Sequence, residues 1–304
     1  MRTREHDDSF VNLSDITEIE LLILRRLREF TMGEHRSIFH GSGFDFVGLR
    51  EWQPGDRLSH VEWAQSTITN FNPLIVRDFE QPSTATVMAI ADTSLSTRCG
   101  IGGVPIASAI ARAIATLGMS AVFFQDAFGL ITYDGRMDVA GVRPRIGKGQ
   151  VIHCLEAYQR GVGLQSMKAT GSLSSAIRGF IRKTSLVPVV SDFLFDRPRD
   201  VLEELSLLNS THDVFLVLID SAFAFELPAV SAGWVEAFDV ETGRSRVISR
   251  RTLKTLAARA TEWQQDIERT AKDLDLDVVR LGIDEAKSDV ALMEFVIERR
   301  LRKG

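Results

Sequence analysis

The sequence is organised around residues 85–100, which read ATVMAIADTSLSTRCG. Its first part, from Thr86 to Ala91, is apolar, and this pattern predicts a parallel strand that is buried on both faces. The strand ends in Asp92-Thr93-Ser94-Leu95-Ser96. Because ligands of open α/β sheets bind beyond the carboxyl ends of the strands, we expect the side chains of this segment to meet a ligand.

Asp92, Ser94 and Ser96 offer one carboxylate and two hydroxyls at alternate positions, which are oxygen donors only. Oxygen donors suit a hard cation, and Mg²⁺ or Mn²⁺ is the expected cofactor. A second apolar strand, expected over 186–190, is followed by Ser191 and Asp192. Asp and Ser also favour helix N-caps and turns, so capping is the alternative for each residue. Two strands that end in aspartate at related places favour the metal site.

Strands and helices alternate along most of the chain, which predicts an α/β protein with a doubly wound, mostly parallel sheet. An amphipathic helix over 15–31 and two strands over 44–52 and 73–80 predict a small N-terminal helix and β subdomain. We therefore expect two domains, residues 1–83 and residues 84–304. The larger one is expected to contain these further elements: a helix over 105–120, a hairpin over 129–139, strands over 213–220 and 276–280, a hairpin over 234–248, and helices over 251–274 and 288–300.

Composition points to an ordinary globular chain, because 44% of its 304 residues are hydrophobic and 25% are charged. The net charge of −5 is spread in mixed signs, which indicates no nucleic-acid partner. The two cysteines, Cys99 and Cys154, lie far apart and fit a reducing compartment. A charged N-terminus predicts no signal peptide, and no run reaches the ~18 apolar residues of a membrane span. The expected location is the cytoplasm.

No catalytic arrangement is visible in the sequence. No G-x-S-x-G elbow or Ser-His-Asp set can be argued, and the missing G-x-x-x-x-G-K-[ST] loop predicts no nucleotide cofactor. An aspartate-dependent phosphohydrolase would use Asp92 as its nucleophile and needs a second Asp where this chain has Ser94. The sequence therefore predicts a protein that is not an enzyme, and the phosphohydrolase is the less favoured alternative.

The block from His35 to Gln81 carries a specific resemblance. It contains G-S-G-x-x-F from Gly41, L-R-E-W-x-P-G-D from Leu49, and a strand that ends in R-D-F-E. Taken together and in this order, these motifs resemble the DUF58 family, and the resemblance extends over about residues 35–300. The chain departs from the family pattern at Val61-Glu62-Trp63 and over 66–69, which puts in doubt any partner contact by basic residues there.

The family joins this signature to a von Willebrand factor A-like domain, and Asp92-x-Ser94-x-Ser96 resembles the first motif of its metal-ion-dependent adhesion site. The resemblance implies a further metal ligand just before a later helix, where either Thr170 or Ser172 could serve after a shift of one residue. It also implies that Asp192 belongs to the last motif and acts on the metal through water.

The resemblance further implies a function. Members of the family accompany MoxR-type AAA+ ATPases, so the expected activity is metal-dependent protein recognition, with such an ATPase or its client protein as partner, in the assembly or maturation of protein complexes. The alternative is a structural adaptor with a vestigial metal site, whose binding surface is the block that contains Trp52 and Trp63.

Overall fold

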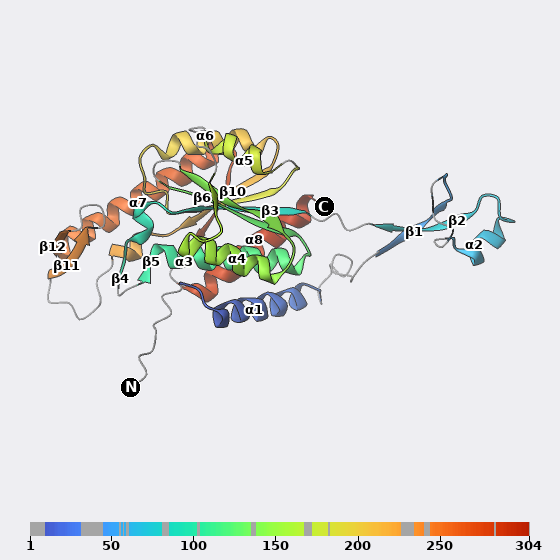
Figure 1. The fold of residues 1–304 in the computed structure, drawn as a ribbon, viewed down its shortest axis with the longest axis horizontal. Helices are drawn as coiled ribbons and strands as arrows, with labels where there is room; N and C mark the ends of the chain where they lie inside the picture. Colours follow the sequence, from blue (N-terminus) through green and yellow to red (C-terminus); the bar gives the residue numbers. More distant parts are fainter. Residues whose placement is uncertain are drawn as a thin grey trace. The chain divides into compact units, whose positions relative to one another are not determined.

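The computed structural model describes the following residues: 10–31, 45–54, 56, 58, 61–80, 85–101, 104–134, 138–166, 172–181, 183–225, 234–239, 244–282 and 284–303. The chain divides into two compact units, residues 25–84 and residues 1–24 with 85–304. Figure 1 gives the element labels used below. Helix α1 (Leu13–Thr31) runs across the first junction, so its first part belongs to the larger unit, whereas the sequence analysis grouped the whole helix with residues 1–83.

The smaller unit is built on an antiparallel pair of strands, β1 (Asp45–Glu51) and β2 (Ile75–Glu80), as the sequence predicts. The turn after β1 is closed by Arg50, whose Nη1 and Nη2 donate to the two carboxylate oxygens of Asp56 at 2.7 and 2.8 Å. Asp56 also accepts from the backbone N–H of Gln53 at 2.7 Å. A bidentate pair of this kind fixes the turn and explains why the L-R-E-W-x-P-G-D motif needs both its Arg and its Asp. The short helix α2 (Trp63–Ile68) lies between the two strands in the sequence.

The larger unit is built on a seven-stranded sheet of order β13-β10-β9-β3-β6-β7-β8. Neighbouring strands from β13 to β6 are parallel, and β7 and β8 add antiparallel partners. The strands are β3 (Thr86–Asp92), β6 (Ala127–Tyr133), β7 (Val139–Arg145), β8 (Gln165–Ser166), β9 (Leu186–Ser191), β10 (Asp213–Ile219) and β13 (Asp277–Leu281). The expected mixed α/β architecture with a mostly parallel central sheet is confirmed.

Helices cover both faces of this sheet, with α5 and α6 on one side and α3 and α4 on the other (Figure 1). One core joins β3, β6, β9 and β10 to α5 (Leu173–Phe180), α6 (Pro198–Asn209) and α7 (Arg250–Asp273). On the opposite face α3 (Ile106–Phe123) packs against both α4 (Lys148–Arg160) and α8 (Glu285–Lys303). Successive side chains of each strand point to opposite faces of the sheet, and helices cover both faces. The central strands are therefore apolar throughout.

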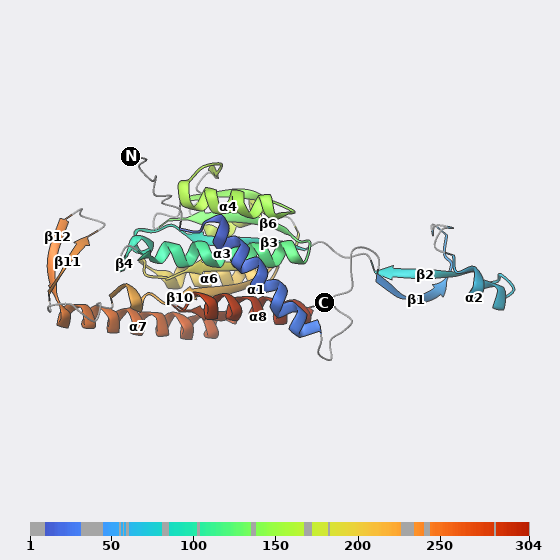
Figure 2. The ribbon, with the colours of Figure 1, turned by 90° about the horizontal axis from the view of Figure 1, so that it is seen from below.

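Smaller elements complete the larger unit. A 3₁₀ helix (Leu95–Arg98) follows β3, and a second one (Ala222–Phe225) follows β10. Two hairpins stand outside the main sheet: β4 (Gly100–Ile101) with β5 (Val104–Pro105), and β11 (Trp234–Asp239) with β12 (Arg244–Ser249). Figure 2 shows the β11–β12 hairpin at one end of α7.

Helix α3 corrects one expectation from the sequence. By length and composition it could cross a membrane, since its 18 residues have a mean hydropathy of 1.7, whereas no such run was expected. In the structure 78% of this stretch is buried, between the sheet and helices α4 and α8. Its alanines let it pack closely on the strands, so its place in the core accounts for its apolar composition.

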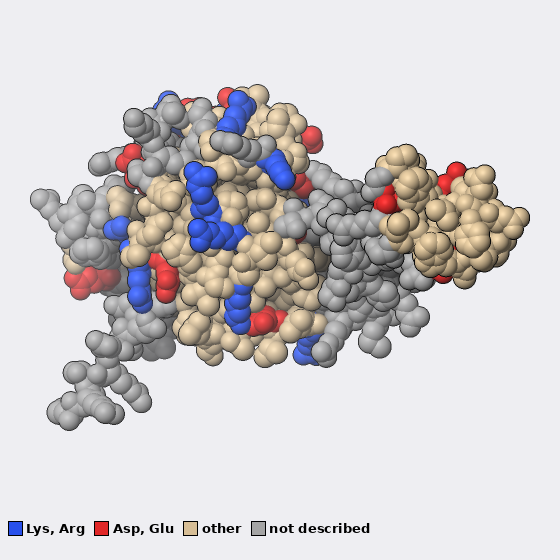
Figure 3. Space-filling view, turned by 45° about the vertical axis from the view of Figure 1, so that its right-hand side comes forward, with Lys and Arg blue, Asp and Glu red and all other residues tan. Residues whose placement is uncertain are grey.

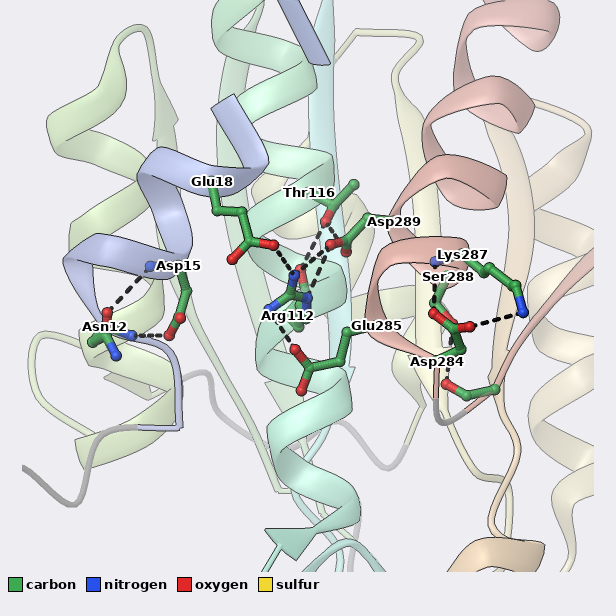
Figure 4. A network of polar contacts seen from close by, with 11 residues as sticks. Asn12, Asp15, Glu18, Arg112, Thr116, Asp284, Glu285, Lys287, Ser288 and Asp289 are labelled. Atoms are coloured by element: carbon green, nitrogen blue, oxygen red, sulfur yellow. Dashed lines mark hydrogen bonds and ion pairs between the residues drawn. The ribbon is translucent and has the colours of Figure 1, made fainter. Parts of the chain in front are cut away.

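A polar network ties α1 and α8 to α3 (Figure 4). The guanidinium of Arg112 on α3 pairs with Asp289 at 2.8 Å and with Glu285 at 2.7 Å, both from α8. Thr116 donates a hydrogen bond of 2.8 Å to the other oxygen of Asp289. Glu18 of α1 lies 3.8 Å from the same guanidinium. Because Asp289 is only 3% exposed, this carboxylate depends on Arg112 and Thr116 for compensation.

We expect Asp289→Ala to destabilise the protein by about 3 kcal/mol, because it leaves a buried guanidinium without its main partner. This loss of unfolding free energy lies at the lower end of what breaking a buried ion pair costs, because Glu285 and Glu18 still face Arg112. Urea unfolding of the full chain measures the effect. The matched control is Glu18→Gln, which removes an exposed and distant partner and should cost less than about 0.5 kcal/mol. Equal losses in the two variants would contradict this account.

Candidate metal centre

The predicted site lies at the carboxyl ends of β3 and β9, which are adjacent and parallel in the sheet. In the sheet, β3 lies between β6 and β9. The strands β6, β7 and β8 extend the sheet on one side of β3, and the later strands β9, β10 and β13 extend it on the other side. This is the point at which the strand order reverses, and open α/β sheets bind their ligands at such switch points. Ala91 is paired with Val190, so Asp92 and Ser191 come next to one another at the edge of the sheet.

Asp92 is fully buried and both of its carboxylate oxygens accept hydrogen bonds. Oδ1 accepts from the backbone N–H of Ser94 at 2.7 Å, and Oδ2 accepts from the hydroxyl of Ser191 at 2.5 Å. Burial raises the pKa of Asp92 above its usual value, more than the hydrogen bonds from Ser191 and Ser94 lower it. Ser191 was missed in the sequence analysis, although it shares a strand face with Val189 and directly precedes Asp192.

The two serines of the motif connect β3 to β9. The hydroxyls of Ser94 and Ser96 lie 3.0 Å apart, and Ser96 donates to Asp192 Oδ1 at 3.1 Å. The same oxygen accepts from the backbone N–H of Leu194 at 3.1 Å. The structure therefore brings the predicted residues Asp92, Ser94, Ser96 and Asp192 into one hydrogen-bonded cluster.

The other oxygen of Asp192, Oδ2, is buried and has no hydrogen-bond partner within the described residues. Burial and the charge of Asp92 raise the pKa of Asp192 to about 7. Two buried carboxylates side by side are costly unless a cation or a proton neutralises them. An oxygen-only cluster with one unsatisfied carboxylate oxygen fits a hard divalent cation. Within the described residues no group of three or more His, Cys, Asp or Glu side chains could hold a metal, so here the serine hydroxyls would supply part of the shell.

The other two predicted ligands, Thr170 and Ser172, are not part of this cluster in the described residues. Thr170 lies outside the described residues. Ser172, just before α5, donates to Glu204 Oε2 of α6 at 3.0 Å, and its hydroxyl lies 2.8 Å from that of Ser174. Glu204 also accepts from the backbone N–H of Ser174 at 3.1 Å, so it satisfies the first turn of α5. A metal role for Thr170 or Ser172 stays a prediction.

Helix α7 supports the site from the side, which the sequence did not indicate. Gln264 is fully buried and donates to the backbone carbonyls of Asp192 at 3.1 Å and Ile219 at 2.8 Å. Trp263 donates through Nε1 to the carbonyl of Phe193 at 2.8 Å. In the sequence these two residues are ordinary members of an amphipathic helix, and only the packing of α7 brings them to the end of β9.

A pocket of about 710 Å³ opens over the two serines. Its lining is mixed, with apolar side chains beside hydroxyls and charges of both signs; the lining residues are Thr93, Ser94, Leu95, Ser96, Arg98, Asp134, Leu194, Phe195, Asp196 and Trp263. Arg98 and Asp196 form no ion pair with any other side chain that the structure describes. On the face of Figure 3, Lys and Arg side chains and a few Asp and Glu side chains lie among larger uncharged areas.

The fold and this cluster define the chain as an α/β protein with an acidic, hydroxyl-rich site at the switch point of its sheet. The chain belongs to the family described as "Protein of unknown function DUF58", which matches residues 48–268. This match confirms the resemblance seen in the L-R-E-W-x-P-G-D signature. No curated protein matches the sequence.

Several solved structures are similar at low identity. The conserved hypothetical protein BatB from Bacteroides thetaiotaomicron is 12% identical with a TM-score of 0.41, over 71% of this chain and 99% of that one. An aerotolerance-related membrane protein from Bacteroides fragilis is 15% identical with a TM-score of 0.43, over 70% and 99%. The pilus adhesin SpaC from Lactobacillus rhamnosus GG is 10% identical with a TM-score of 0.39, over 74% and 31%.

Proposed function

We propose that this protein is a non-enzymatic, cytoplasmic recognition module with a von Willebrand factor A-like domain, which binds a partner protein through Mg²⁺ or Mn²⁺. The supporting observation is the cluster of Asp92, Ser94, Ser96 and Asp192, in which one buried carboxylate oxygen is left without a partner. These residues would hold the cation as a metal-ion-dependent adhesion site. The proposal includes no nucleotide and no reaction.

The chemistry of the cluster favours recognition by an acidic group. Serine hydroxyls bring no charge to a divalent cation, so the site neutralises it only in part and leaves it attractive to an anion. A Glu or Asp side chain of a partner can supply the missing oxygen and the missing charge. The pocket over Ser94 and Ser96 gives such a side chain access to the site.

The walls of the pocket indicate the surroundings of that acidic residue. Leu95, Phe195 and Trp263 offer apolar surface, and Trp263 is 40% exposed. Arg98 adds a cation without an ion-pair partner among the described side chains. The fitting partner segment therefore carries an acidic residue beside an apolar one. In line with the resemblance to DUF58 proteins, we propose a MoxR-type AAA+ ATPase or its client as the partner, in assembly or maturation of protein complexes.

The partner is tested by affinity capture from the native cell extract, in parallel with Mg²⁺ and with EDTA. We expect a protein, such as an AAA+ ATPase, that is retained with Mg²⁺, released by EDTA, and lost with the Asp92→Ala bait. Arg98→Ala should weaken retention by roughly tenfold, because it removes one charge contact without touching the cation cluster. Asp196→Ala, which removes a charge of the opposite sign from the same pocket, is the matched control and should retain the partner.

An adaptor that does not use the metal is the second candidate, and one observation favours it. In the smaller unit Trp52 and Trp63 are 36% and 56% exposed, together with Leu58, Ile68 and Phe71, so these tryptophans are surface residues. A partner retained equally in EDTA and by Asp92→Ala, but lost with Trp63→Ala, would favour this adaptor. Turnover of a phosphoester that disappears in Asp92→Ala would overturn both candidates.

A further inference from the structure

The sequence contains two tyrosines, and the structure brings both to the aspartate pair. Tyr133 ends β6 and is the register partner of Asp92 on the neighbouring strand. Tyr158 of α4 donates its hydroxyl to the backbone carbonyl of Asp92 at 3.1 Å. Burial, together with the charges of Asp92 and Asp192, raises the pKa of both phenols, and the hydroxyl of Ser191 partly offsets this rise for Tyr133.

The two phenols differ in how they are satisfied. Tyr158 has the Asp92 carbonyl as its acceptor, whereas the hydroxyl of Tyr133 is buried near the hydroxyl of Ser191 and makes no hydrogen bond of good geometry with any described residue. Asp192 Oδ2 is in the same situation. A buried polar atom without a partner costs free energy and is rare in folded proteins. Tyr133 is the register partner of Asp92 on one side of β3, and Asp192 follows β9 on its other side, so one further polar group at Asp92 would give both atoms a partner.

The ring of Tyr133 is held in place by aromatic packing. It lies edge-on to the ring of Phe195 with centroids 6.1 Å apart, and Phe195 in turn lies 6.0 Å from Phe193. Phe193 and Phe195 follow Asp192 in the chain, and Phe195 also lines the pocket. The ring of Tyr133 is therefore packed against the segment that carries Asp192.

We propose that Tyr133 is a positioning residue of the cation site, whose hydroxyl and Asp192 Oδ2 together hold one water molecule that binds the cation. This inference rests on the proposed cation site at Asp92, Ser94 and Ser96. A water that gives a lone pair to a cation has two protons to donate, and a carboxylate and a phenol oxygen can accept them. The arrangement satisfies both buried atoms and lets Asp192 act through water.

Tb³⁺, a luminescent hard cation, is the probe, together with calorimetry of Mg²⁺ on the full chain. We expect Tyr133→Phe to lower the affinity for Tb³⁺ and for Mg²⁺ by roughly tenfold, as is usual when a group that orients the coordination shell is removed. Luminescence lifetimes in H₂O and D₂O should give about one coordinated water fewer than in the wild type. The melting temperature of the metal-free protein should fall by less than in Tyr158→Phe, because the Tyr133 hydroxyl makes no hydrogen bond of good geometry there.

Tyr158→Phe is the matched control, because it removes the phenol hydroxyl that already has an acceptor. It should lower the melting temperature of the metal-free protein and leave the water count unchanged. If Tyr133→Phe keeps the affinity and the water count while Asp92→Ala loses binding, this inference is wrong and the cation site stands. A water count that rises in Tyr133→Phe also overturns it. If the wild type binds neither Tb³⁺ nor Mg²⁺, the proposed function fails as well.

Discussion

Replacing Asp92 with alanine is expected to weaken Mg²⁺ or Mn²⁺ binding by more than about 100-fold, since it removes the carboxylate on which the cluster is built. Asp92 accepts from both Ser94 and Ser191, so its loss also frees the groups that fix the ends of β3 and β9. Isothermal calorimetry on the wild type and on Asp92→Ala measures the affinity directly.

Two controls separate the loss of a ligand from the loss of the fold. Asp196→Ala removes an exposed carboxylate from the same pocket and should leave the affinity within about threefold of the wild type, because exposed charges are screened. Asp92→Asn keeps the shape of the side chain and its acceptor oxygen, so circular dichroism should show a native spectrum while cation binding is still lost. A cation response that is the same in the wild type and in Asp92→Ala would remove the proposed metal site.

The stability of the metal-free protein is expected to fall as the pH rises from about 4 to about 7, and Asp192 is the reason. Burial and the charge of Asp92 raise the pKa of Asp192 from 3.8 to about 7 in the folded protein. A carboxyl group with a raised pKa binds its proton more tightly when folded. Its contribution to stability is therefore complete below pH 3.8 and is lost as the pH rises to about 7.

A shift of this size corresponds to stability on the order of 4 kcal/mol. Urea unfolding in EDTA between pH 4 and pH 8 measures it, with Asp192→Asn as the test variant, because asparagine stays neutral throughout. We expect the wild type to lose stability relative to Asp192→Asn across this interval, and Asp196→Asn to follow the wild type. Parallel curves for the wild type and Asp192→Asn would show that the buried carboxyl is not the cause.

The same protonation links pH to the cation. Mg²⁺ would bind the deprotonated cluster, so the stabilisation that it gives should grow as the pH rises towards 8. Over the same interval the free energy of unfolding of the metal-free protein is expected to fall. The proposed site would thus accept a proton at low pH and a cation at neutral pH.

Most of the long helices and strands of the larger unit could be predicted from the sequence, whereas the short strands β4, β5 and β8 could not. The apolar runs of β3, β9 and β10 needed no tertiary information, because a strand that is covered on both faces has to be apolar throughout. Helix α1 followed from its amphipathic spacing in the same way. The cluster of Asp92, Ser94, Ser96 and Asp192 could also be anticipated, since residues that follow parallel strands meet at one edge of a sheet. The DUF58 signature was readable because its residues are close in sequence.

Only the tertiary structure decided how the cluster is completed. Three residues lie beside the aspartates because of the tertiary structure: Tyr133 on β6 and Ser191 on β9, whose strands flank β3, and Gln264 on α7, which packs at the end of β9. The order of the strands is set by packing between distant segments of the chain. The hydrogen bond from Ser172 to Glu204 likewise depends on how α6 lies beside α5. The unpaired oxygen of Asp192 and the raised pKa of its carboxyl arise from burial, which local sequence patterns do not specify. Local periodicity determines elements, whereas desolvation and long-range contacts determine the chemistry of the residues at their ends.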